Sequence, residues 1–305
     1  MLRFLILRIF TAVIVIFGAI TVIFVLARLV GDPVALMIQP GMSEVQVNEL
    51  RQALGLDRPM IEQYGVFVVN ALSGDFGESP WQYESAFKLV IERLPATLLL
   101  AACGLGLSMI IAILVGTISA LKRGSLVDRF AMTVVLLGQS IPNFWLGLML
   151  ILLFAVQLRW LPAAGYGRVE HIILPMVTLS LFSLARLTRL VRSELLDVMA
   201  QDYIRTARSK GLPDRVILFR HALRNAMIPI VTVLAVDFGI LVGGAVVTET
   251  IFAWPGIGRL MIQAIGQRDF PILQAAAFVV AVLVVLSNFV ADLMYAWLDP
   301  RIRYG

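Results

Sequence analysis

Charged residues are scarce in this chain. Asp, Glu, Lys and Arg make up 15% of its 305 residues, whereas 60% of the residues are hydrophobic. Because soluble domains carry about 25% charged residues, this composition excludes an ordinary soluble domain and predicts a membrane protein. The net charge of +5 does not predict a nucleic-acid partner, since the basic residues lie between hydrophobic runs, where membrane lipid is the expected neighbour.

Residues that build metal and catalytic sites are also few. The single cysteine, Cys103, lies in an apolar run, so neither a disulfide nor a multi-cysteine metal site is possible. The two histidines, His171 and His221, are expected on opposite sides of the membrane. A P-loop needs Gly-Lys followed by Ser or Thr, and none of the three lysines stands in that context. We therefore predict no catalytic residue, metal, cofactor or ATPase site in this chain.

Long hydrophobic runs are abundant instead. The six predicted spans are 9–27, 94–121, 130–158, 172 to about 191, 225–248 and 270–291. The first run is longer than a signal-peptide core and no A-x-A cleavage site follows it, so we expect it to be retained. The fourth is the weakest, because only 14 residues, Ile172–Ala185, are free of charge, a length more typical of a buried or re-entrant segment.

The distribution of charge favours keeping the fourth span. With six spans, one side of the membrane holds 16 basic and 6 acidic residues (+10), and the other holds 9 basic and 12 acidic residues (−3). Two further acids, Asp237 and Asp292, lie within spans. Since the positive side faces the cytosol, we predict a multi-pass protein with both termini in the cytosol.

The predicted fold is an all-α membrane protein with six transmembrane helices and a small helical external segment. Its parts are a transmembrane helix (1–30), an extracytoplasmic helical segment (31–93) and a five-helix core (94–300) that contains a cytosolic loop (198–224). In the external segment, Ser43 and Gln46 match a capping box that begins a helix. Two roles fit this segment, a cap over the bundle and a docking surface.

Small and helix-breaking residues mark three of the spans. In the second, a small residue recurs every four positions, at Gly104, Ser108, Ala112, Gly116 and Ala120. In the fifth, Gly239 and Gly243 form a GxxxG pair. Such faces allow close helix packing, either within the chain or against another subunit. In the third, Pro142 predicts a kink or break, which suits either a pathway or a structural bend.

Positive charge is concentrated in residues 204–225, IRTARSKGLPDRVILFRHALRN, which contain six basic residues and one acid, Asp214. We expect a short helix from Asp202 through Lys210, ended by Gly211, and a second helix that starts at Pro213. A positive loop resting on anionic lipid would explain the charge. It would not explain the turn or the apolar residues of the second helix, and these favour a protein groove as the partner.

Several motifs resemble the dipeptide/oligopeptide/nickel permeases of ATP-binding-cassette (ABC) importers, and they extend through most of the chain. The most specific is the cytoplasmic "EAA" loop, here QDYIRTARSKG (201–211) followed by HALRNAMIP (221–229). The others are LGLDRP (54–59), GDFGES (74–79), RLPATL (93–98), LGQSIPNFWLG (137–147), WLP (160–162), ILP (173–175), ETIFAWPGIGRL (249–260), RDFP (268–271) and LDPRIR (298–303).

The resemblance implies a type I ABC importer permease fold in a bacterial cytoplasmic (inner) membrane. Its loop would be a coupling helix seated in a cleft of a separate ATPase subunit, so that ATP and Mg belong to partner chains. Ala207 and Gly211 match the general pattern of that loop, whereas Arg205 and Thr206 replace its first residues, as in the peptide branch. The expected coupling residues are Arg205, Thr206, Ala207, Lys210, Gly211, Leu212 and Arg215.

The resemblance also implies partners and a mechanism. Two homologous permeases would enclose the pathway, with two ATPases on the cytosolic side and a substrate-binding protein outside, and transport would proceed by alternating access. We assign the pathway to Pro142, Asn143, Asp237, Gly239 and Gly243. We assign binding-protein docking to the 29–93 loop and to Phe252, Trp254 and Pro255.

Asp237 has two interpretations, because a carboxylate in mid-span is costly and needs a cavity or a partner. It would either face the pathway and favour a cationic substrate, or pair with a polar group of the second permease.

Two other functions compete with an ABC permease. A proton-coupled secondary transporter would use Asp237 but should show inverted repeats, which are not evident. A membrane enzyme would need a catalytic motif, which is also not evident. Within the favoured interpretation, the cargo could be di- or oligopeptides, nickel or glutathione-like solutes.

Overall fold

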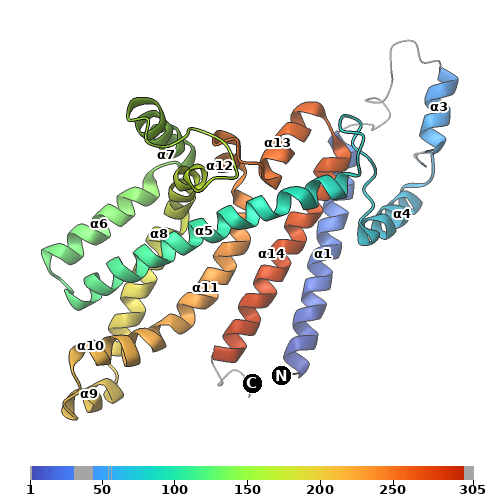
Figure 1. The fold of residues 1–305 in the computed structure, drawn as a ribbon. Helices are drawn as coiled ribbons and strands as arrows, with labels where there is room; N and C mark the ends of the chain where they lie inside the picture. The colour runs from blue at the N-terminus through green and yellow to red at the C-terminus, as the bar shows by residue number, and fades with distance from the viewer. Residues whose placement is uncertain (1, 31–43, 54, 56, 299–305) are drawn as a thin grey trace. The chain divides into compact units, whose positions relative to one another are not determined.

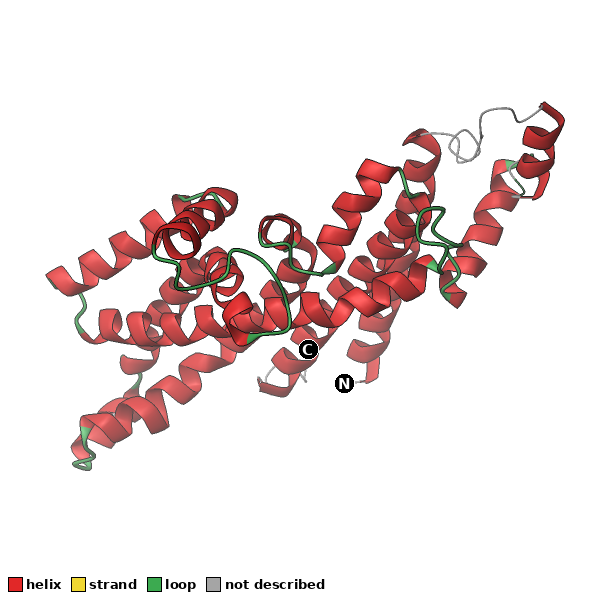
Figure 2. Cartoon of the chain, turned by 45° about the horizontal axis from the view of Figure 1, so that its top comes forward, coloured by secondary structure: helices red, strands yellow, loops and turns green. Residues whose placement is uncertain are grey.

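The computed structural model describes residues 2–30, 44–53, 55 and 57–298, and in these ranges the chain is helical, with no strand beyond one isolated bridge between Glu78 and Ser85 (Figure 2). The elements in chain order are α1 (Leu2–Val30), α3 (Glu44–Ala53), α4 (Met60–Ser73), α5 (Ala86–Leu121), α6 (Leu126–Ser140), α7 (Asn143–Leu150), η1 (Ile151–Gln157), α8 (Val169–Met199), α9 (Asp202–Ser209), α10 (Asp214–Val216), η2 (Ile217–Ala222), α11 (Leu223–Gly244), α12 (Val246–Ile251), α13 (Ile257–Gln267) and α14 (Phe270–Leu298) (Figure 1).

The predicted membrane spans correspond to long apolar helices. Among the described residues, α1, α5, α8, the continuous α10–η2–α11 and α14 are each long and apolar enough to cross a bilayer. The sixth is a bent pair, α6 with α7–η1, whose halves meet at 98°. The break at Pro142 is therefore confirmed, and it turns the third span into two arms. The fourth span, α8, runs to Met199, so its length is ordinary.

The chain forms two compact units, which differ from the consecutive segments that the sequence suggested. Unit 1 comprises residues 1–97 and 255–285, and unit 2 comprises residues 98–254 and 286–305. The reason is a core that joins distant parts of the sequence: Ile20 of α1, Phe76, Val90 of α5, Ile257 of α13 and Ile272 of α14 belong to one buried cluster. Contacts across the sequence, rather than chain order, define unit 1.

In unit 1 the loop between α4 and α5 is anchored by the side chains of Ser79 and Trp81. The buried Asp269 carboxylate accepts a hydrogen bond from the Ser79 hydroxyl, and its other oxygen accepts from the Ile272 amide at the start of α14, 3.2 Å away. The Trp81 indole donates to the Gln267 carbonyl at 2.9 Å. The loop that contains GDFGES is thus tied to the α13–α14 corner.

Two expectations for the external segment meet different outcomes. The proposed cap residue Ser43 lies outside the described residues, although α3 does begin at Glu44 and ends before Gly55, whose φ of +65° suits glycine. The span expected to start at residue 94, where the external segment ends, begins earlier, because α5 starts at Ala86 and continues to Leu121 without interruption.

In unit 2 the small residues of α5 pack against α8. A Cβ atom built at Gly116 would lie 2.8 Å from Val191 Cβ, and one at Gly104 would lie 3.2 Å from Leu179 Cβ. The Ser108 hydroxyl donates to the Ser180 carbonyl at 2.5 Å. Of the two interpretations of this face, packing within the chain is the one observed.

Candidate functional site

The basic elbow, residues 198–224, is built around a helix with a well-formed end. α9 begins after Gln201 and ends at Ser209, with Asp202 in its first turn, where a negative charge favours the helix dipole. Gly211 has φ +75°. Its amide donates to the Arg208 carbonyl at 2.9 Å, and the Leu212 amide donates to the Ala207 carbonyl at 3.3 Å. These two bonds form a Schellman motif, so the predicted stop at Gly211 is confirmed.

The second helix of the elbow is the beginning of a span. Pro213 caps α10 at Asp214, and the helix then continues through the π-helical η2 into α11. The predicted start at Pro213 is therefore confirmed within one residue. The fifth span, which was expected to start at Asn225 as a separate helix, begins eleven residues earlier, at Asp214. α9 is thus joined by one tight turn to a membrane-spanning helix, and Figure 1 shows α9 and α10 together where α8 ends.

The elbow rests on an apolar cluster. Ile204 and Ala207 of α9 are buried with Ile217 of η2 and Leu195 of α8, and Ala120 at the end of α5 belongs to the same cluster. The Asn225 amide donates to the Tyr203 hydroxyl at 2.8 Å and adds a polar tie. Because both arms and α8 share one core, the elbow is a packed body rather than a free loop.

The outer surface of the elbow is basic. All six basic residues of the segment are exposed: Arg205, Arg208, Lys210, Arg215, Arg220 and Arg224. Exposed ion pairs of 3.5 Å (Arg205–Asp202) and 3.9 Å (Arg208–Asp214) contribute little to stability. Phe219 projects among them with 65% of its surface exposed. A positive surface with an exposed aromatic ring suits an acidic protein groove.

The predicted coupling residues divide into two groups. Ala207 is buried in the cluster, so its part is to seat α9 and not to touch a partner. The other six are exposed: Arg205, Thr206, Lys210, Gly211, Leu212 and Arg215.

Asp237 is fully buried on α11, and its carboxylate forms an ion pair with Arg186 of α8. The sequence placed a structural partner on a second permease, whereas the structure places it in the same chain. Arg186 lies thirteen residues before the end of α8. The signal for this pair was a single aspartate in the apolar fifth span beside a fourth span that contains arginines.

The other pathway residues lie on two elements. Pro142 is exposed and Asn143 is half-buried at the α6–α7 break, while Gly239 is buried and Gly243 half-buried on α11. Both α7 and α11 contact α8. The pathway assignment of these residues stays a prediction.

A second ion pair was missed by the sequence analysis. The Arg192 guanidinium donates to both oxygens of Asp128, at 2.8 and 2.7 Å. Asp128 also accepts from the Gly124 amide at 2.9 Å. The pair ties the start of α6 to α8.

The aromatic residues assigned to docking are not exposed as that role requires. Phe252 and Trp254 have only 1% and 2% of their surfaces exposed. The Trp254 ring meets Tyr166 edge to face, with centroids 4.9 Å apart, and a Cβ at Gly147 would lie 3.2 Å from the Phe252 ring. These side chains hold the turn in place. Of the three residues assigned to docking, only Pro255 is partly exposed.

Two models of known protein families match most of the chain. A family model described as "Binding-protein-dependent transport system inner membrane component" matches residues 112–304. A second, for the N-terminal part of such membrane components, matches residues 1–101. Together the two cover both ends of the chain and all of the elbow.

Named relatives agree with this match. The chain is 42% identical to a di/tripeptide transport system permease, DppB, of Pseudomonas aeruginosa strain UCBPP-PA14, over 94% of this chain and 95% of that one. It is 40% identical to an oligopeptide transport system permease, AppB, of Bacillus subtilis strain 168, over 90% of each. It is 39% identical to a glutathione transport system permease, GsiC, of Escherichia coli O1:K1, over 90% of each.

A solved structure shares the fold. The MetNI methionine ABC transporter, in an inward-facing form, contains a chain that superposes with a TM-score of 0.57 at 20% identity, over 69% of this chain and 96% of that one.

Proposed function

The chain belongs to the family of binding-protein-dependent transport inner-membrane components, and on this premise we propose that it forms, with a second homologous permease, the pathway of a peptide importer. It is a multi-pass permease subunit of an ABC importer. Two ATPase subunits would bind the cytosolic side and carry ATP and Mg, and alternating access would move the substrate.

The observation that carries the proposal is the exposed basic elbow seated on a buried cluster. A partner that pushes on α9 acts through this shared core on α8 and on the helix that becomes α11. Force can therefore pass from the cytosol to two spans without a flexible joint. The partner surface should be acidic, because the elbow presents six exposed basic residues.

Di- and oligopeptides are the proposed substrates. This rests on relatives named for di/tripeptide and oligopeptide transport at 42% and 40% identity. Glutathione-like solutes are the second candidate, favoured by the relative at 39% identity that is named for glutathione transport.

Docking of an external binding protein is proposed for the loop between α4 and α5. Trp81 is 59% exposed and Tyr83 is 84% exposed, while Ser79 and Trp81 tie the loop to the α13–α14 corner. Exposed aromatic residues on a held backbone lose little entropy on binding. Phe252 and Trp254 are buried, so they offer no aromatic surface to a binding protein.

The orientation follows from the charge bias of the sequence. We propose that the elbow and both termini face the cytosol of a bacterial inner membrane, because the positive-inside rule puts the basic elbow there.

Co-purification tests the proposal. A tagged chain should bring down the second permease and two ATP-binding chains from solubilised bacterial membranes. An Arg208→Glu/Arg215→Glu variant should retain the permease and lose most of the ATPase, because two charges of the contact surface are reversed. Equal ATPase recovery with the variant would contradict the elbow's role.

A further inference from the structure

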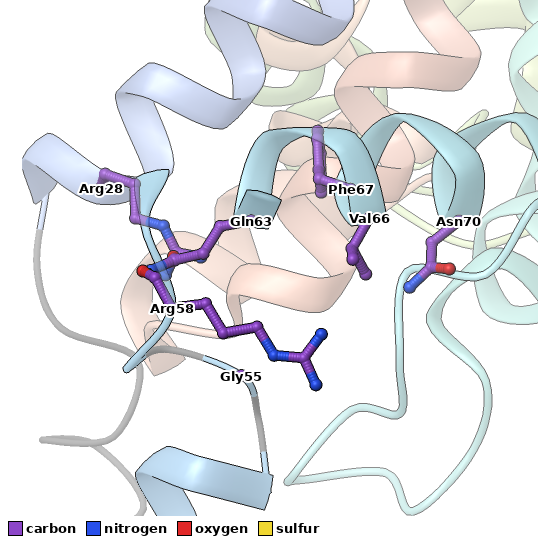
Figure 3. Close-up of a pocket in the computed structure, with 7 residues that line it drawn as sticks. All are labelled: Arg28, Gly55, Arg58, Gln63, Val66, Phe67 and Asn70. Atoms are coloured by element: carbon purple, nitrogen blue, oxygen red, sulfur yellow. The ribbon is translucent and has the colours of Figure 1, made fainter. Parts of the chain in front are cut away.

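Unit 1 contains a pocket whose lining residues belong neither to the elbow, nor to the assigned pathway, nor to the loop between α4 and α5. It has a volume of about 270 Å³ and is lined by Arg28, Gly55, Arg58, Gln63, Val66, Phe67 and Asn70 (Figure 3). Two of these residues are cationic and two have side-chain amides. None of the described residues that line the pocket is acidic. The lining therefore suits an anion.

The arginines enter the pocket from different elements. Arg28 lies in the last turn of α1, and its guanidinium carbon is 5.3 Å from the centre of the Phe24 ring. Arg58 precedes α4, and its backbone carbonyl accepts a hydrogen bond from the Gln63 amide at 2.8 Å. In Figure 3 the Arg58 side chain runs beneath α4 toward Val66, with Asn70 at the other end. Arg28 is thus positioned by the Phe24 ring, whereas Arg58 is anchored through its backbone and its side chain is exposed.

The pocket lies at the boundary of the membrane. The uncharged run of α1 ends at Ala27, one residue before Arg28. α4 packs beside this end of α1, since the Tyr64 and Thr21 hydroxyls are hydrogen-bonded at 2.7 Å and the Tyr64 ring meets Phe24 edge to face. At this depth the abundant anion is the phosphate of a lipid headgroup.

One side of α4 faces outward with apolar side chains. Ile61, Val69 and Leu72 are largely exposed, and their spacing places them on one face of the helix. Val66, about half exposed, lines the pocket next to this face. A helix with an exposed apolar face at a membrane boundary lies in the interface, where acyl chains can contact Val69 while the headgroup reaches the arginines.

We propose that this pocket binds the phosphate of a phospholipid headgroup. Arg58 and Arg28 pair with the phosphate oxygens, Asn70 hydrogen-bonds the polar end of the headgroup, and Val66 and Phe67 contact its glycerol backbone. Its residues are not among those assigned to the transport pathway, and the bound lipid anchors α4 and the end of α1 to the lipid surface.

The test uses the assembled transporter that contains this chain. Native mass spectrometry would count phosphatidylglycerol retained after release from nanodiscs, for wild type, Arg28→Gln, Arg58→Gln and an Arg268→Gln control. Arg268 is exposed, belongs to unit 1 and lies outside the pocket. We expect the apparent affinity to fall about tenfold in Arg58→Gln and to be unchanged in the control. Equal retention in all variants would overturn the proposal.

Further arms identify the source of the phosphate and guard against misfolding. Arg58→Lys, which keeps the charge and loses the bidentate fork, should show intermediate retention, provided that its unfolding midpoint matches wild type. Phosphatidylcholine should also bind, more weakly, because it shares the phosphate diester. Inorganic phosphate should not displace the lipid. If it binds as tightly as the lipid and the same variants abolish its binding, a free anion is the ligand and the lipid is not.

Discussion

Arg186 and Asp237 place opposite charges inside the membrane-spanning part of unit 2. The aspartate is fully buried, whereas 43% of the arginine side chain is exposed. Removal of the arginine would leave a buried carboxylate without its counter-charge, and removal of the carboxylate would leave a cation that can reach water. We expect Arg186→Gln to lower the free energy of unfolding by about 3 kcal/mol and Asp237→Asn by about 1 kcal/mol, measured in mixed micelles.

The matched control is Arg189→Gln, one turn along α8 at an exposed position, which should change stability little. The double variant Arg186→Gln/Asp237→Asn should be more stable than Arg186→Gln alone, since no charge remains unpaired. Because Arg186 already neutralises Asp237, we expect Asp237→Asn to reduce uptake of cationic and neutral dipeptides in the same proportion. A selective loss of cationic dipeptides would instead place the carboxylate in the pathway.

At the scale of elements, the contact of α5 with α8 depends on Gly116. A methyl group there would meet Val191 Cβ at 2.8 Å and the Thr188 carbonyl at 2.9 Å. Gly116→Ala should lower the free energy of unfolding by about 2 kcal/mol through this overlap. Gly106→Ala, on the same helix with no neighbour within 4 Å, should be neutral or stabilising. Equal effects of the two would show that α5 does not pack on α8 through this face.

A second prediction at the scale of elements concerns the turn of the elbow at Gly211. Gly211 and Gly124 have almost the same φ, +75° and +78°, and neither has a neighbour within 4 Å of the Cβ position that a side chain would occupy. Alanine at either site should cost about 1 kcal/mol of stability. Only Gly211→Ala should also lower ATP-driven peptide uptake, because in the proposed coupling role only that turn would direct α9 toward the ATPase. Equal uptake by the two variants would argue against a coupling role for the turn.

At the scale of the whole molecule, the spans could be predicted because the length of an apolar run is a local property. The stop at Gly211 and the break at Pro142 were predictable for the same reason. Long-range contacts could not be predicted. These are the joining of residues 255–285 to the N-terminal part, the Arg186–Asp237 pair, and the burial of Phe252 and Trp254. Each depends on which helix lies beside which, and helix composition alone does not specify that.

The most direct test of the central claim is uptake of a labelled dipeptide into proteoliposomes, measured with ATP and with a non-hydrolysable analogue. With the second permease, both ATPases and the binding protein present, we predict uptake that requires ATP hydrolysis and falls sharply when Arg208 and Arg215 are reversed in charge. This chain reconstituted alone should move no peptide. Uptake by the chain alone, without nucleotide, would contradict the claim that the elbow transmits the work of a partner ATPase.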